Sequence, residues 1–280
     1  MNTLDPTAMV KTLRDLPALQ PVLMQLVQSF EQPEANLGCI ARGVARDQAL
    51  AAKTLRLANS SFYGLQSQVR TIQQAITVLG FDTMRSMIMA AGIIDNFSQT
   101  GENGFDFRGF WQHAIGVALS ARSLAGHANL NPELGFMCGL LHDIGTLVLV
   151  TKFPQQHAAV LAYRQQTDCH LLDAERHVLG TDHAAVGSRL AEHWRFPLLI
   201  QKALANHHAP QRDDFGGLAS VVHVADAVAH ALDLSAQEED LVPPMSEAAW
   251  DSLAMNDTRL HAVFRATETD FKEACRILSP

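Results

Sequence analysis

The chain has 280 residues, 48% of them apolar, so it can bury a sizeable core as one large domain or two small ones. Its net charge of −8 argues against non-specific binding to nucleic acid, because an acidic surface repels phosphate backbones. Its four cysteines form no CxxC pair, which excludes a disulfide framework or a zinc knuckle and indicates a reducing compartment.

The N-terminus shows no basic region followed by an apolar stretch and a cleavage site, as a signal peptide would. Later apolar windows contain His, Asp, Gly or Arg, and we expect none to reach the roughly 20 residues that a membrane span needs. The sequence therefore predicts a soluble, cytoplasmic protein with no membrane partner.

The first hundred residues show the periodicity of short helices. Apolar residues recur at helical spacing up to Pro33, and Asp47 and Thr71 are placed to cap later helices. After the helix that ends before Pro33, we expect helices over residues 36–46, 49–58, 72–79 and 81–97. Residues 98–106 are rich in glycine and polar side chains, which predicts a linker. We therefore expect an N-terminal helical subdomain over residues 1–100 and a second helical part over residues 101–280.

The second part also follows a helical pattern. The expected helices cover residues 107–126, 132–150, 154–167, 171–179, 182–194, 197–207 and 218–232. A polar loop over residues 233–245 ends in Pro243-Pro244, and a last helical segment covers about residues 246–278. Ala and Leu dominate the composition and no strand pattern is visible, so the predicted fold class is all-α.

The chain carries 13 histidines, and one subset lies with two aspartates on expected helices or at their ends. Imidazole and carboxylate groups together suit Fe, Mn, Zn or Ni ions, which converging helices of a bundle can hold. Each residue alone is more often a packed histidine or a capping aspartate; the order of the series favours a metal site. The candidate ligands are His113, His142, Asp143, His183, His207, His208 and Asp226.

Asp143 is the catalytic candidate, because its two oxygens could bridge two divalent ions. It follows His142 within one expected helix, so the two side chains should point about 100° apart. Gly145 and Gly187 would let neighbouring helices approach closely around the site. The other histidines are interpreted as surface or satisfied residues: His127, His157, His170, His177, His193, His230 and His261.

This series resembles the metal-binding pattern of the HD superfamily, most closely the HD-GYP type. The N-terminal half resembles the HDOD family in the stretches LPALQPVLMQL, RDQALAAKTLRLANSSFYG and VRTIQQAITVLGFDTMRSMIMA. The resemblance continues through FWQHAIGVALSARSLA, GLLHDIGTLVL and ANHHAP, and extends over residues 16 to about 230. It implies an N-terminal helical subdomain packed on an HD-like helical core, and a signalling or regulatory role in bacteria.

Two departures from the active HD-GYP pattern are visible. Thr146 stands where a lysine follows HDIG, and HHAPQRDDFGG lacks the GYP motif after the paired histidines. Loss of a cation beside a phosphate removes a charge-assisted contact worth roughly 1.5–3 kcal/mol. A metal ion could therefore bind while hydrolysis of a cyclic dinucleotide is lost or altered.

Three hypotheses follow. The favoured one is a regulatory binding module that contacts a signalling protein partner and retains the metal site. The second is a metal-dependent phosphohydrolase acting on a nucleotide or cyclic dinucleotide. In that case Asp143 bridges two ions, a bridging hydroxide attacks phosphorus, and each ion has three further ligands: His142, His113 and Asp226 for one, and His183, His207 and His208 for the other. A purely structural metal ranks last, because structural zinc sites are rich in cysteine.

Overall fold

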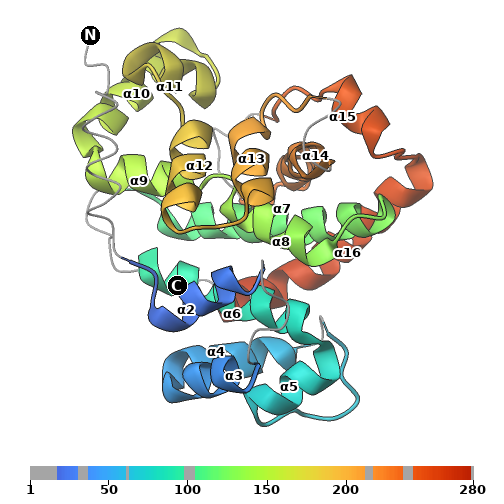
Figure 1. The fold of residues 1–280 in the computed structure, drawn as a ribbon. Coiled ribbons are helices and arrows are strands. Elements are labelled where there is room, and N and C mark those ends of the chain that lie inside the picture. Colours follow the sequence, from blue (N-terminus) through green and yellow to red (C-terminus); the bar gives the residue numbers. More distant parts are fainter. Residues whose placement is uncertain are drawn as a thin grey trace.

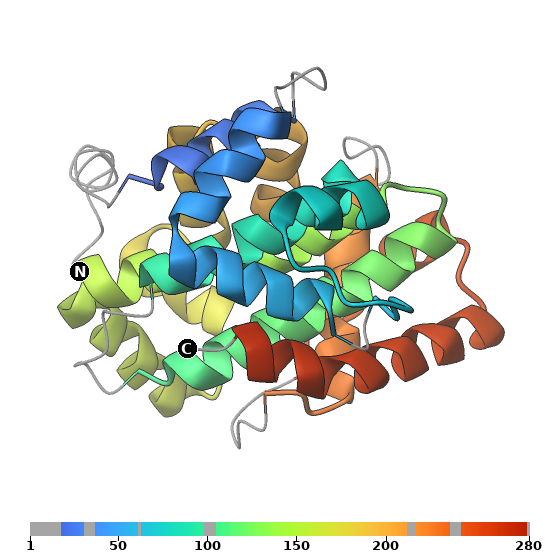
Figure 2. The same ribbon diagram turned by 90° about the horizontal axis from the view of Figure 1, so that it is seen from below.

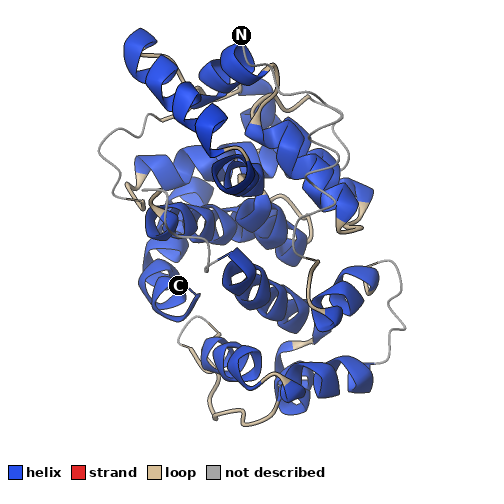
Figure 3. Cartoon of the chain, turned by 90° about the vertical axis from the view of Figure 1, so that its left-hand side faces the viewer, coloured by secondary structure: helices blue, strands red, loops and turns tan. Residues whose placement is uncertain are grey.

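The structure, a computed structural model of the chain, describes residues 18–30, 37–60, 63–97, 105–211, 217–235 and 242–278. Within these ranges the chain forms helices and no strand, which confirms the predicted all-α class (Figure 3). Residues 98–104 of the predicted linker and 236–241 of the predicted polar loop lie outside the described residues. The division into two parts near residue 100 therefore stays a prediction.

The N-terminal helices gather at one end of the molecule (Figure 1). They are α2 (Pro21–Gln28), α3 (Leu37–Arg46), α4 (Gln48–Ala58), α5 (Ile72–Leu79) and α6 (Phe81–Phe97). As predicted, Asp47 caps α4 by accepting from the Leu50 N–H, and Thr71 caps α5 by accepting from the Gln74 N–H. Helices α2, α4 and α5 all pack on α6, which is buried along most of its length.

The next eight helices build the larger part of the molecule. They are α7 (Phe107–His127), α8 (Pro132–Leu141), α9 (Ile144–Lys152), α10 (Pro154–Thr167), α11 (Leu171–Leu179), α12 (His183–His193), α13 (Leu198–Asn206) and α14 (Leu218–Ala231). Helix α7 packs along α8 and α14, while α12 packs between α9 and α13. The candidate ligands lie on or beside α7, α12, α13 and α14 and at the junction of α8 and α9.

The prediction of one continuous helix over residues 132–150 is wrong. The helix breaks at His142 and Asp143, and Asp143 adopts φ −100° and ψ 12° before α9 begins. The break lets α8 pack on α7 while α9 turns against α12. No proline marks this point, and both halves are apolar, so the periodicity runs through the break.

The predicted last helix, about 246–278, is also two helices, α15 (Glu247–Ser252) and α16 (Asp257–Leu278). Between them Ala254 takes a left-handed conformation, with φ +47°. Helix α16 then runs along α7 and reaches α4 and α6 (Figure 2). A buried hydrogen bond joins the Ser120 and Thr267 hydroxyls, 3.1 Å apart, so α16 is tied to α7 and also covers the N-terminal helices.

The expectation that no apolar stretch reaches the length of a membrane span needs correction at residues 132–152. By length and composition it could cross a membrane, with a mean hydropathy of 1.7 in its most apolar window. In the structure it is divided between α8 and α9, and 83% of that window is buried inside the protein. A core helix of a soluble protein passes the same test, so the stretch is weak support for a membrane span.

Candidate metal centre

All seven candidate ligands converge in the structure. They come from the middle of α7 and α14, the junction of α8 and α9, the first residue of α12 and the end of α13. Asp143 belongs to two adjoining groups, and within each set of three or four side chains the ligand atoms lie within 4.8 Å of one another. The break between α8 and α9 places His142 and Asp143 at helix ends, where both side chains can face the same centre.

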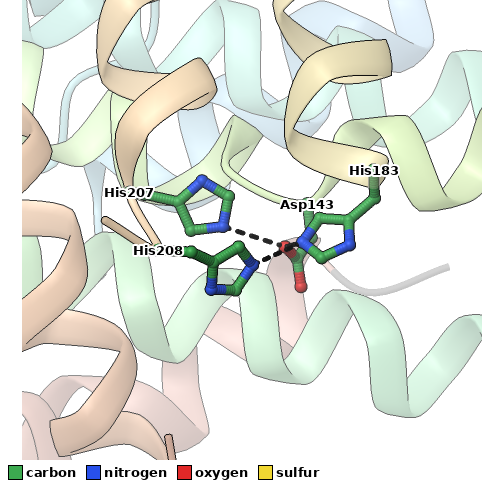
Figure 4. A group of neighbouring side chains, drawn as sticks. All are labelled: Asp143, His183, His207 and His208. Carbon is green, nitrogen blue, oxygen red and sulfur yellow. Dashed lines mark hydrogen bonds and ion pairs between the residues drawn. The ribbon is translucent and has the colours of Figure 1, made fainter. Parts of the chain in front are cut away.

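One group contains Asp143 and three histidines (Figure 4). The Oδ1 atom of Asp143 lies 3.2 Å from Nε2 of His183 and 3.6 Å from Nε2 of His207. Nε2 of His208 lies 2.7 Å from Nε2 of His183. The nitrogens of three imidazoles therefore gather around one carboxylate oxygen.

The second group faces the other oxygen of the Asp143 carboxylate. Oδ2 of Asp143 is 3.2 Å from Nε2 of His142, which is 3.8 Å from Oδ1 of Asp226. The same Asp226 oxygen lies 3.1 Å from Nε2 of His113 and 3.3 Å from Nε2 of His230. Asp143 thus faces a different histidine cluster with each of its oxygens.

The interpretation of His230 as a surface or satisfied residue needs correction. Its side chain is 12% exposed and lies against Asp226 in the second group. The sequence held a signal for this contact, because Asp226 and His230 are four residues apart and share one face of α14.

Glu175 is a second residue that the sequence analysis missed. This fully buried side chain on α11 contacts His183 twice, and its Oε2 atom lies 2.6 Å from Nδ1. The same oxygen accepts a hydrogen bond from the His183 backbone N–H at 2.9 Å. A turn separates the two residues along the chain, so no helical spacing connects them and the sequence carries no signal for the pair.

Backbone carbonyls fix the orientation of two other rings. Nδ1 of His142 lies 2.8 Å from the Gly139 carbonyl oxygen, and Nδ1 of His207 lies 2.7 Å from that of Leu204. A carbonyl can only accept, so Nδ1 carries a hydrogen and, in the neutral ring, the lone pair sits on Nε2, facing the cluster. Histidines that bind metals in proteins are held in this way.

The buried atoms at the centre fit a divalent ion. Among the described residues, the atoms there without a hydrogen-bond partner include Nε2 of His142, Nε2 of His207, Oδ1 of Asp143 and Oδ1 of Asp226. Such atoms are costly to bury unless something compensates them. Nitrogen and carboxylate donors without sulfur suit Fe, Mn, Zn or Ni.

Strong electrostatic coupling accompanies this arrangement. Burial works against ionisation of Asp143, but the charges of His142 and His183 outweigh it and hold the pKa of this carboxyl well below its usual range. Burial also disfavours a charged His183, yet the carboxylates of Glu175 and Asp143 raise its pKa well above the usual value. The Asp143 carboxylate is therefore ionised, and its negative charge favours a bound cation.

The pKa of His208 is shifted in the opposite direction to that of His183. Burial, together with the charges of His207 and His183, lowers the pKa of His208 to about 2. The close contact between the two Nε2 atoms is then an N–H of cationic His183 donating to neutral His208. A divalent ion bound between these nitrogens would take the place of that proton.

A cavity of about 320 Å³ opens onto the centre. Its lining includes side chains of both groups, from His113 and Asp143 to His208 and His230. Phe105, Phe110, Thr146 and the Pro243-Pro244 pair also line it, together with the facing turns of α10 and α11. A small molecule in this cavity could reach both groups.

The fold and site define an all-helical protein with a histidine–aspartate centre of the HD type. The sequence profile of the HDOD domain matches residues 16–210, and the chain therefore belongs to the HDOD family. This confirms the resemblance seen in the sequence. The match ends before α14, although Asp226 and His230 of that helix belong to the centre.

Solved structures extend the similarity over nearly the whole chain. A candidate phosphohydrolase from Shewanella amazonensis SB2B is 25% identical, with a TM-score of 0.77, and the alignment covers 97% of this chain and 98% of that one. A candidate signal transduction protein from Marinobacter aquaeolei VT8 is 22% identical, with a TM-score of 0.77, over 95% of this chain and 60% of that one. These structures share the fold of an N-terminal helical subdomain packed on an HD-like core.

An uncharacterized protein from Treponema pallidum (strain Nichols) is 25% identical over 228 residues. The alignment covers 78% of this chain but 43% of that protein. The chain therefore spans less than half the length of this relative.

Proposed function

We propose that the chain is a bacterial regulatory HDOD module that binds a pair of divalent metal ions and relays a signal to a protein partner. The observation that carries the metal assignment is the position of Asp143, whose two oxygens face separate histidine clusters. HDOD membership and the similarity to a candidate signal transduction protein support the regulatory role.

The residues divide naturally between two ions that share Asp143. The first ion would be held by His183, His207 and His208, and the second by His142, His113 and Asp226. His230 joins the second set, because it contacts the same Asp226 oxygen as His113. The donor set contains no cysteine, which argues against a purely structural zinc site.

A phosphohydrolase acting on a nucleotide-type phosphoester is the second candidate, and the cavity of about 320 Å³ beside the ligands favours it. Bound ions would supply charge for a phosphoryl group and an activated water. Residue 146 is a buried threonine in this cavity, so no lysine from that position binds phosphate. The similarity to a candidate phosphohydrolase supports this function as well.

Elemental analysis of the purified chain tests the proposal. We expect one or two equivalents of Fe, Mn, Zn or Ni in the native protein, and a loss of metal in His142→Ala, whose Nε2 atom faces the centre. The exposed His261 gives a matched control, His261→Ala, which should keep its metal. A native protein that holds no metal and takes up none on aerobic or anaerobic reconstitution would refute the proposal.

The Glu175→Gln variant is expected to bind metal roughly 10- to 100-fold more weakly, the usual cost of losing the carboxylate behind a ligating histidine. An amide still accepts a hydrogen bond from His183 but cannot stabilise its charge. Metal titration of the stripped protein measures the effect. Glu192→Gln, an exposed carboxylate on α12, is the control and should match the native protein. Equal affinities in all three proteins would remove Glu175 from the proposed centre.

A further inference from the structure

One wall of the cavity is built by the last turn of α10 and the first turn of α11. Arg164 contributes from α10, and His170 through Asp173 contribute from the start of α11. None of these residues belongs to the two ligand groups. The cavity therefore has a binding wall that is distinct from the metal centre.

The start of α11 is open to an anion. His170 occupies the N-cap position, and its side chain makes no capping hydrogen bond. The first N–H groups of a helix have no partner within the helix, and the helix dipole places partial positive charge at this end. Helix N-termini with this geometry bind phosphate groups.

Two further observations indicate that the same cavity receives a ligand. Nδ1 of His113 and Oδ1 of Asp226 have no hydrogen-bond partner among the described residues, and the side chains line the cavity with only 11% and 7% exposed. Arg164, in the last turn of α10, is the arginine among the described lining residues, and Asp173 lies in the first turn of α11. The arginine fork suits a phosphate, which it can bind through two parallel hydrogen bonds.

We propose that Arg164 and the first turn of α11 form an anion subsite for a phosphate group of the ligand that occupies the cavity. Arg164 gives the cavity a positively charged side chain, whereas Thr146 is an uncharged residue in the same lining. It uses residues outside the ligand groups, so it binds phosphate with or without metal in the centre. Its failure and the failure of the proposed metal centre can therefore be told apart.

The test is a calorimetric titration of the full chain with inorganic phosphate and with pyrophosphate, both as purified and after treatment with a chelator. We expect the native protein to bind in both states, and Arg164→Ala to bind on the order of ten-fold or more weakly, since charge-assisted hydrogen bonds are lost. Arg164→Lys should recover part of the affinity, because it keeps the charge but loses the planar fork.

Arg189→Ala is the control, since Arg189 is an exposed arginine on α12 paired with Glu192. It should bind both probes as the native protein does, and circular dichroism should show native helicity in all variants. Native-like phosphate affinity in Arg164→Ala would overturn the proposal, as would a chelator-treated native protein that binds neither probe. Metal content measured on the same samples reports on the metal centre separately.

Discussion

Replacing Asp143 with alanine is expected to remove metal from both halves of the centre and to abolish any phosphoester turnover. Both oxygens of this carboxylate face histidine clusters, so no other ligand compensates for its loss. The fall in affinity should exceed the roughly 10- to 100-fold cost of losing a hydrogen-bond partner of a ligand. Metal analysis and a screen of phosphoester substrates, nucleotides and cyclic dinucleotides included, measure the two effects.

Helicity should be unchanged in the same variant, because the Asp143 side chain makes no capping hydrogen bond to α9. Asp251→Ala, an exposed aspartate on α15, serves as the control and should keep its metal. Metal retained in Asp143→Ala at the native stoichiometry would contradict the assignment of this residue as the bridge.

The Gly145→Ala variant is expected to lose about 3 kcal/mol or more of unfolding free energy, at the upper end of what overpacking costs. A methyl group at Gly145 would overlap the backbone carbonyl oxygen of His183 and lie 2.6 Å from the amide nitrogen of Gly187. These are backbone atoms of α12, which cannot move without displacing the helix. Urea unfolding followed by circular dichroism measures the loss.

Gly126 offers a matched control within α7. It is exposed, and a methyl group there would meet only a proline carbon 3.9 Å away. Gly126→Ala should therefore stabilise the protein by about 0.4–1 kcal/mol, through the lower entropy of the unfolded chain. Equal stabilities of the two variants would show that the contact between α9 and α12 is not as close as the structure has it.

The close approach of α9 and α12 was predictable from Gly145 and Gly187, and the structure confirms it. Helix bounds were predictable where capping and stop signals frame a periodic segment. Thr71 and Gly80 define α5 in this way. The break at His142 and Asp143 was not predictable, because neither residue is a helix breaker and only packing against α7 and α12 imposes it.

The residues of the candidate metal centre were also only partly predictable from the sequence. The order of the histidines and aspartates was sufficient to select seven residues that meet in space, although no local spacing joins His113 to Asp226. His230 could have been included, since it is one helical turn from Asp226. Glu175 could not, because its contact with His183 depends on the conformation of the turn between α11 and α12.

The path of α16 has a consequence for how the protein is made. A ribosome releases the N-terminal helices first, and domains generally begin to fold as they emerge. The faces of α4 and α7 that α16 covers cannot be completed until that helix follows, long after both have been synthesised. Until then these apolar faces are exposed on the nascent chain, where a chaperone or a neighbouring chain can reach them.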